Sequence, residues 1–339
     1  LTDRGGVYQK DRPTDGNFAA PTADEVAIQS PMYVVRSARV STGGANTRWN
    51  QTEYSYAQLL ANKWGRGILG FRGRTVVENV LVDADGSNRD ASKSLTTSAL
   101  ASQSWPHVGK IKSTVKTYQR GVNDSPIIAS SSFDYFADSR AGANLPGTAT
   151  VSDPVASSTA RYSTYRIYRS VPVKSVQTAT DTDGSAMPTV TTYTGMDETT
   201  GTVSFLDSFG NPTRIVTVTR HPTQASEVWK QTVTNNYYNN GGDTTRWLLG
   251  KLRDSTTQND YTSASGVLVS QTRKASWTYH GIDTGSCGSV AGQLCSETVE
   301  PDAIALGDAT LLQKSTYEYD GFGNRTKATL SFYADKLLT

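Results

Sequence analysis

The sequence predicts an all-β protein built from consecutive β-hairpins, and three observations carry this prediction. Short runs of alternating, strand-prone residues recur from about residue 30 to the end. Gly, Asn and Asp separate these runs, as they do at tight turns. The composition agrees, because only 36% of residues are hydrophobic, Tyr (17) outnumbers Phe (8), and there are 29 Gly.

The expected strands share a period of two and an enrichment in Val, Thr, Tyr and Trp. They are Tyr33–Arg36, Thr75–Glu78, Lys112–Tyr118, Tyr162–Tyr168, Arg214–Thr219, Val267–Ser270 and Ala275–Tyr279. The turns expected between strands are Asp85-Gly86, Asp183-Gly184, Gly210-Asn211, Asn240-Gly241-Gly242 and Gly323-Asn324. Helical stripes are scarce, and the best candidates are Ala57–Lys63 and Ala303–Lys314.

The chain has 339 residues, which favours either two domains or one extended repeat architecture. We expect residues 1–50 to form N-terminal strands and loops that are partly irregular. Residues 51–339 are expected to form one hairpin-repeat segment. Because the chain begins at Leu1, it is interpreted as an internal piece of a longer polypeptide or a processed product.

Two segments repeat the pattern Asp-x-Phe-Gly-Asn, each after a predicted strand and before a Thr and a basic residue. They are Leu206–Arg214 and Tyr319–Lys327. Asp207 and Asp320 can accept hydrogen bonds from backbone N–H groups in the turn. Gly210, Asn211, Gly323 and Asn324 tolerate the left-handed backbone that a tight connection requires.

Tyr317 and Tyr319 stand two residues apart, so they share one face of the sheet. Burying an aromatic side chain of that size contributes roughly 1.5–3 kcal/mol. Neighbouring hairpins can therefore stack their tyrosines.

The segment Tyr317–Asn324 resembles the signature YD repeat of the Rhs/YD-repeat family. In the earlier copy, Leu206 replaces the second tyrosine and Pro212 follows the asparagine. Two further stretches resemble the Rhs-like B subunits of insecticidal toxin complexes. They are Tyr54–Tyr56 followed by Gly65–Arg72, and Trp247–Leu252 before a Ser/Thr-rich strand. Together they place the resemblance over about residues 50 to 330.

The resemblance implies YD-repeat β-hairpins that form part of a spiral β-cocoon or barrel shell. In that family the shell encloses a toxic polypeptide until delivery, which implies secretion or a bacterial cell-surface location. The implied partners are the remainder of the same Rhs polypeptide, its toxin payload and other toxin-complex subunits. Teneurin-like proteins use a similar barrel for adhesion, so a surface adhesion or glycan-binding module is the alternative. The six Trp residues fit either packing between hairpins or sugar stacking.

Cys287 and Cys295 have seven residues between them, most of them small, so a loop could close into a disulfide. Free thiols and a metal site remain alternatives, although His280 alone does not complete the four ligands that zinc usually takes. A disulfide would indicate an oxidising, extracellular destination.

The sequence gives less support to three more specific functions, namely dinucleotide binding, calcium binding and catalysis. Gly65–Gly70 spells GxGxxG, but strand-like residues follow where a dinucleotide site needs a helix. Asp83–Ser87 and Asp181–Ser185 could hold calcium, yet they fit Asp-Gly hairpin turns better. His107, His221 and His280 are far apart, and neither GxSxG nor HExxH occurs.

We therefore expect a structural protein rather than an enzyme, and no cofactor. The net charge of +2 is spread over 33 basic and 31 acidic residues, so no nucleic-acid partner is expected. No stretch approaches the roughly 20 apolar residues that would span a bilayer, so no transmembrane segment is expected.

Overall fold

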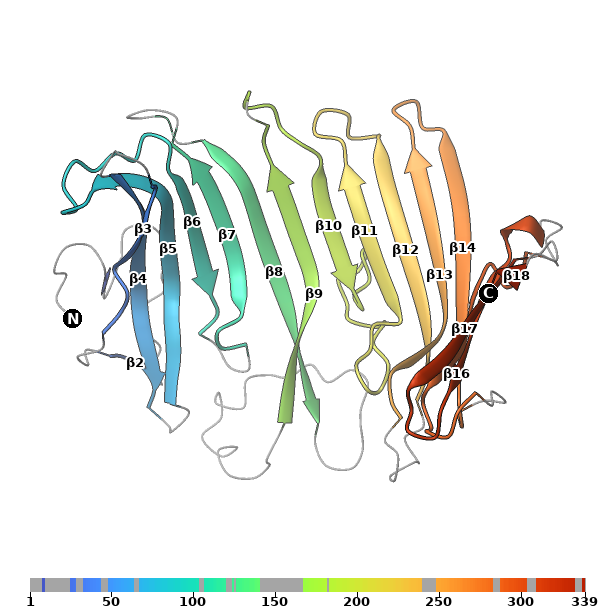
Figure 1. The fold of residues 1–339 in the computed structure, drawn as a ribbon. Coiled ribbons are helices and arrows are strands. Elements are labelled where there is room, and N and C mark those ends of the chain that lie inside the picture. The colour runs from blue at the N-terminus through green and yellow to red at the C-terminus, as the bar shows by residue number, and fades with distance from the viewer. Residues whose placement is uncertain are drawn as a thin grey trace. The chain divides into compact units, whose positions relative to one another are not determined.

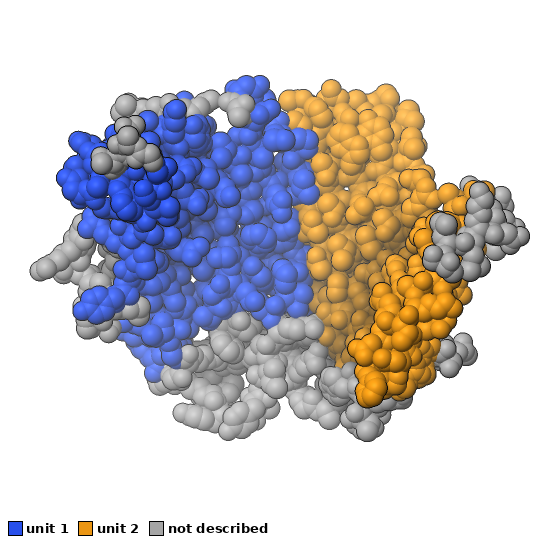
Figure 2. Space-filling model, in the orientation of Figure 1, with its two compact units in different colours: residues 1–139, 150–190 blue, residues 140–149, 191–339 orange. Residues whose placement is uncertain are grey.

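A computed structural model of the chain describes most of its length, in two compact units. The described residues are 8–9, 25–28, 33–43, 48–63, 67–103, 107–119, 124, 126–140, 167–181, 183–239, 248–282, 287–303, 309–332 and 337–338. Unit 1 comprises residues 1–139 and 150–190, and unit 2 comprises residues 140–149 and 191–339 (Figure 2). The predicted boundary at residue 50, between an irregular N-terminal part and the hairpin-repeat segment, is not tested by this division and stays a prediction.

Unit 1 is an antiparallel sheet whose strands follow one another along the chain. Consecutive strands from β4 to β8 pair antiparallel, and Figure 1 shows β4 to β7 side by side. Two short strands, β2 and β3, pair antiparallel with β4, and β1 pairs parallel with it. The strands are β1 (Tyr8–Gln9), β2 (Glu25–Ala27), β3 (Ser37–Ser41), β4 (Arg48–Asn62), β5 (Gly67–Asp83), β6 (Leu95–Ala101), β7 (Ile111–Tyr118), β8 (Ile127–Arg140) and β9 (Ile167–Ala179).

Unit 2 has the same sequential arrangement. Each strand from β11 to β18 pairs antiparallel with the next, and Figure 1 shows β11 to β14 as neighbours. The strands are β10 (Thr189–Thr194), β11 (Arg214–Arg220), β12 (Val228–Tyr238), β13 (Lys251–Thr262), β14 (Leu268–Tyr279), β15 (Leu294–Val299), β16 (Gln313–Tyr319), β17 (Arg325–Phe332) and β18 (Leu337–Leu338). The predicted all-β class is confirmed, since the described residues contain no α-helix.

The two helical candidates were wrong. Ala57–Asn62 belongs to β4, where Leu59 and Leu60 are both buried, at 1% and 2% exposure. Gln58, also buried at 3% exposure, has a positive φ of 51°, and the register with β5 shifts between Leu60 and Ala61, so this end of β4 departs from the regular alternation of a strand. In the second candidate, residues 304–308 lie outside the described residues. The described remainder holds one 3-10 turn, η1 (Ala309–Leu311), before β16 begins.

Most predicted strands lie within observed ones, with three qualifications. Tyr33–Arg36 precedes β3 and is not part of a strand, and Tyr162–Arg166 lies outside the described residues. Val267 belongs to the turn before β14, which begins at Leu268. The predicted turn at residues 240–242 also lies outside the described residues. Gly65 and Arg66 of the GxGxxG pattern are likewise not described, but β5 begins at Gly67, so the pattern runs into a strand and not a helix.

Cross-strand pairs of hydroxyl groups replace many of the apolar pairs that a sandwich sheet would carry. Thr75 and Ser98 face each other in the β5–β6 register with their oxygens 3.2 Å apart. The same pairing joins Thr114 to Ser131 at 2.6 Å and Thr278 to Ser296 at 2.7 Å. Such pairs stabilise adjacent strands without requiring a dry face. The abundance of Thr and Ser in the sequence follows from this design.

Fully buried apolar side chains are correspondingly few in the described part of the chain. The largest are Leu59, Leu60, Val80, Val82, Val173 and Val216. Most strand residues are half-buried. The sheet is therefore stabilised mainly by its backbone ladder, cross-strand pairs and turns.

Candidate functional site

Five connections in the described part of the chain have one backbone pattern. The first residue donates its N–H to the carbonyl four positions on, and a glycine three positions on donates back to the first carbonyl. In the last copy, Asp320 N to Asn324 O is 3.0 Å and Gly323 N to Asp320 O is 3.1 Å. The five turns are 83–87, 181–185, 207–211, 263–267 and 320–324. Their glycines have φ values of 88°, 89°, 77°, 81° and 89°, a region where a Cβ is strained.

In the last turn, the Asp320 carboxylate gathers three donors. Its Oδ1 accepts the backbone N–H groups of Phe322 and Asn324, both at 2.9 Å, and its Oδ2 accepts Asn324 Nδ2 at 3.0 Å. Hydrogen bonds from the side chain and then the backbone of Asn324 hold the pKa of Asp320 below its usual value. Asp, Gly and Asn of the repeated motif thus each have a separate role in closing the hairpin.

The earlier copy repeats this arrangement and extends it. Asp207 Oδ1 accepts the N–H groups of Phe209 and Asn211 at 2.9 and 2.7 Å, and Oδ2 accepts Asn211 Nδ2 at 2.9 Å. A fourth donor, Asn239 Nδ2, lies 2.7 Å from Oδ2. Asn239 in turn accepts the Gly250 N–H at 2.8 Å. Asp207 therefore ties its own turn to the end of β12 and the start of β13.

One of the five turns was missed by the sequence analysis. Ser263 replaces the aspartate, and its hydroxyl accepts the Val267 N–H at 3.0 Å. The available signal was Gly266, three residues after Ser263 and between two Thr/Val-rich runs.

The two DxDGS segments close the same way, although residue 182 lies outside the described residues. Asp85 Oδ1 accepts both the backbone N–H (2.9 Å) and the hydroxyl (2.7 Å) of Ser87. Asp183 Oδ1 accepts the equivalent groups of Ser185 at 2.8 and 2.6 Å. Both carboxylates thus act as acceptors inside their own turns.

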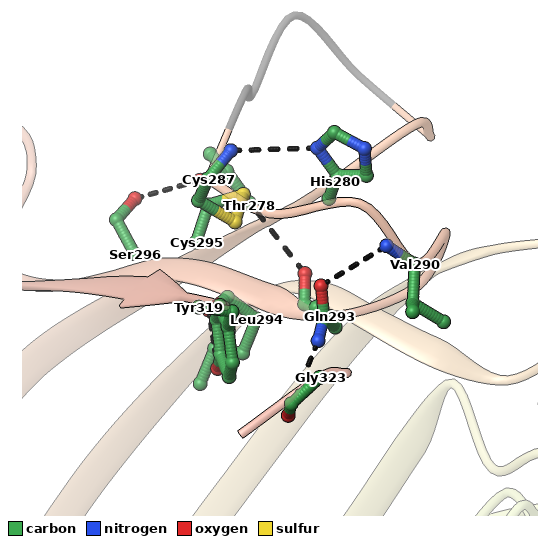
Figure 3. The surroundings of a disulfide bond; sticks show 10 residues. All are labelled: Thr278, His280, Cys287, Val290, Gln293, Leu294, Cys295, Ser296, Tyr319 and Gly323. Carbon is green, nitrogen blue, oxygen red and sulfur yellow. Dashed lines mark hydrogen bonds between the residues drawn. A yellow bond between two sulfur atoms is a disulfide. The ribbon is translucent and has the colours of Figure 1, made fainter. Parts of the chain in front are cut away.

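Cys287 and Cys295 form a disulfide with Cα atoms 5.3 Å apart (Figure 3). Loop residues 287–293 return to the end of β14, where His280 N donates to Gln293 O and Gly292 N donates to His280 O, both at 2.8 Å. Cys287 N lies 3.4 Å from His280 Nδ1. The disulfide therefore closes a short loop at the junction of β14 and β15.

This loop also holds the last repeated turn. Tyr319 donates its backbone N–H to Cys287 O at 3.0 Å and its hydroxyl to Leu294 O at 2.9 Å. Gln293 Nε2 lies 3.4 Å from Gly323 O, as Figure 3 shows. Tyr319 is thus fixed by the disulfide loop, whereas the Tyr317 ring lies under the Arg325 guanidinium, 4.2 Å from the ring centroid.

The potential ligand atoms of His280, Cys287 and Cys295 lie within 4.8 Å of one another. Both sulfur atoms are bonded to each other, so neither is the thiolate that a metal ion binds. Only the imidazole retains a strong ligand atom in this state.

One histidine has a serine partner, as a nucleophilic site would require. His107 Nδ1 lies 2.8 Å from Ser170 Oγ. Burial, followed by the charges of Lys112 and Lys110, lowers the pKa of His107. These influences oppose the imidazolium that a general base must become, whereas a catalytic triad stabilises that ion with a carboxylate. The pair fits a structural hydrogen bond better than a nucleophilic site.

Comparison with solved structures identifies chains of the same fold. A crystal structure of TcdB2-TccC3-Cdc42 matches with a TM-score of 0.57 and 10% sequence identity, over 84% of this chain and 18% of that chain. TcdB2-TccC3 without its hypervariable C-terminal region matches with a TM-score of 0.55 and 10% identity, over the same shares. TcdB2-TccC3 matches with a TM-score of 0.54 and 11% identity, over 84% and 19%.

At this identity the likeness shows the fold alone, and it agrees with the all-β hairpin fold predicted from the sequence. The chain spans less than a fifth of the length of these matching chains. No protein-family model matches the sequence, and no curated protein matches it either. Among the described residues, no helix is long and apolar enough to cross a membrane.

Proposed function

We propose that the chain is a wall segment of an Rhs/YD-repeat shell that encloses a toxin polypeptide. The observation that carries this proposal is the likeness in fold to toxin-complex structures over 84% of the chain. The implied partners are the remainder of the same polypeptide, its payload and other toxin-complex subunits. A secreted or cell-surface protein fits both these partners and a disulfide, which persists in oxidising compartments.

The function is mechanical and non-catalytic. Consecutive antiparallel strands leave few unpaired edges, and the repeated turns return each strand to its neighbour. Hydroxyl pairs on half-buried faces suit a wall that meets a polar interior. Such a wall keeps a payload away from solvent and proteases without binding it chemically.

Limited proteolysis of the longer native polypeptide tests this proposal. We expect the segment enclosed by the shell to resist trypsin until denaturant opens the wall, and then to be cut rapidly. A control polypeptide that carries the payload without these 339 residues should be digested at once. Equal digestion rates for the two polypeptides would contradict encapsulation.

A further inference from the structure

Unit 1 contains a polar cleft of about 600 Å³ that the proposed wall function does not use. Its floor is one face of β3, β4 and β5, because Ser37 pairs with Glu53 and Glu53 pairs with Val77. Its wall is the connection after β5, which contributes Gly86 and Arg89. A cleft of this volume is of the size that binds small ligands.

The cleft is organised by a chain of hydrogen bonds between charged and polar side chains. Arg89 binds both oxygens of Glu53, at 2.8 and 2.9 Å. Gln51 links Arg39 to Glu53, accepting from Arg39 Nε at 2.6 Å and donating to Glu53 at 2.8 Å. The hydrogen bond from Arg89, working against burial, lowers the pKa of Glu53, so the carboxylate is ionised at neutral pH.

Positive charge remains after these pairs are counted. The lining has three arginines, Arg36, Arg39 and Arg89, against one carboxylate, Glu53. Arg39 is also near the Asp85 carboxylate, which is engaged with Ser87. The Arg36 charge contributes to the lowered pKa of Glu53. Its backbone carbonyl accepts the Tyr54 N–H at 2.8 Å, but its guanidinium has no hydrogen-bond or ion-pair partner among the described residues. Its guanidinium therefore offers a fork of N–H donors that suits a carboxylate.

The rest of the lining determines the class of ligand. Ser37 and Ser55 supply hydroxyl groups, and Val77 is the one aliphatic side chain of the described lining. A peptide ligand would need apolar pockets to anchor its side chains, and this lining supplies almost none. A small ligand rich in hydroxyl groups would instead meet a lining that is almost entirely polar.

We propose that this cleft binds a saccharide that carries a carboxylate, with the carboxylate on Arg36 and the sugar hydroxyls against the polar lining that includes Ser37 and Ser55. Arg89 and Glu53 fix the wall of the site against its floor. The site is independent of the proposed encapsulation.

Saturation-transfer difference NMR on the full chain tests this site, with D-glucuronate as the probe and D-glucose as its neutral counterpart. We expect glucuronate to bind and glucose to give no signal. Arg36→Gln should weaken glucuronate binding roughly tenfold to hundredfold, which is the usual effect of losing a charged hydrogen bond. Arg220→Gln, at an exposed position of β11, is the matched control and should bind normally.

Each contrary result overturns the proposal in a different way. Equal binding of glucose would remove the role of the carboxylate, and unchanged binding by Arg36→Gln would place the ligand elsewhere. Triglutamate displacing glucuronate at equal concentration would make the site one for acidic peptides, and sulfate displacing it equally would make it a simple anion site. Arg36 is exposed, so the variant should keep the parent's circular dichroism and melting temperature. Arg36→Glu is a second variant that should abolish binding.

Discussion

Replacing Asp207 tests whether a repeated turn also links distant strands. Its carboxylate accepts four N–H donors, two from the backbone of its own turn and two from the side chains of Asn211 and Asn239. In Asp207→Ala the two backbone donors lose about 1 kcal/mol each, and the lost tether to Asn239 adds a fraction of that. We expect unfolding to become easier by about 2–3 kcal/mol. For a unit of this size that corresponds to a fall in melting temperature of roughly 4–12 °C.

Asp320→Ala is the matched comparison, because Asp320 closes the same backbone pattern without a donor from a distant strand. Its turn is also open to water, since Phe322 at its tip is 93% exposed. Water can replace the lost acceptor there, so the melting temperature should fall less than in Asp207→Ala.

Asp207→Asn should lie between the parent and Asp207→Ala. The amide oxygen can still accept from Phe209 and Asn211, but the new NH₂ group would face the side-chain N–H donors of Asn211 and Asn239. Differential scanning calorimetry measures the melting temperatures. Hydrogen exchange at the Gly250 amide reports the tether directly, because Asn239 accepts that N–H. If Asp207→Ala melted no lower than Asp320→Ala, or Gly250 stayed equally protected, the linking role would be wrong.

Three further predictions concern unit 2. Replacing Cys287 and Cys295 together by serine should lower the free energy of unfolding of the unit by about 2–3 kcal/mol, which is the chain-entropy value for so short a loop. An unchanged melting temperature in calorimetry would show instead that hydrogen bonds alone hold the loop. Glu198 is subject to burial, but bonds from Lys230 at 2.9 Å and Arg214 at 2.8 Å outweigh it and lower its pKa. The ionised carboxylate therefore stabilises the fold above the unfolded pKa of about 4.3, and this stabilisation is lost as pH falls through the lower folded pKa. In Glu198→Gln, the free energy of unfolding measured in urea should depend less on pH below about 5. An unchanged pH dependence would contradict this. Asp320→Ala combined with Gly323→Val should disorder the last hairpin, because Gly323 has a φ of 89°, and unchanged protease resistance there would show the turn to be dispensable.

The sequence was most informative where a local chemical rule applies. An aspartate followed three residues later by glycine predicts the turns at Asp207 and Asp320. The turn needs a side-chain acceptor and a residue that tolerates a positive φ, and both lie within five residues. The fold class follows from the same rules repeated along the chain. The turn at Ser263 has the same geometry, but its acceptor is a hydroxyl group, so a pattern that requires aspartate does not predict this turn.

Interactions between residues far apart in the sequence could not be predicted in this way. Asp207 and Asn239 are 32 positions apart, and only the register of β11, β12 and β13 brings them together. The arginine cleft depends in the same way on pairing of β3 and β5 with β4. The error at Ala57–Lys63 arose because three consecutive residues of this strand, Gln58 to Leu60, are buried, so the run lacks the alternation by which a strand is predicted.

The recurring five-residue turn restricts the amino-acid sequence at only two of its positions. It needs a glycine at the fourth place and, in each copy, an oxygen-bearing side chain at the first or third place to hold a backbone N–H. The remaining places are open to any residue that tolerates solvent. Half-buried strands joined through hydroxyl pairs are similarly permissive, because few positions must fit a tightly packed interior. With so few fixed positions, two chains can share this fold with little sequence in common, and this chain matches TcdB2-TccC3-Cdc42 with a TM-score of 0.57 over 84% of its length at 10% identity.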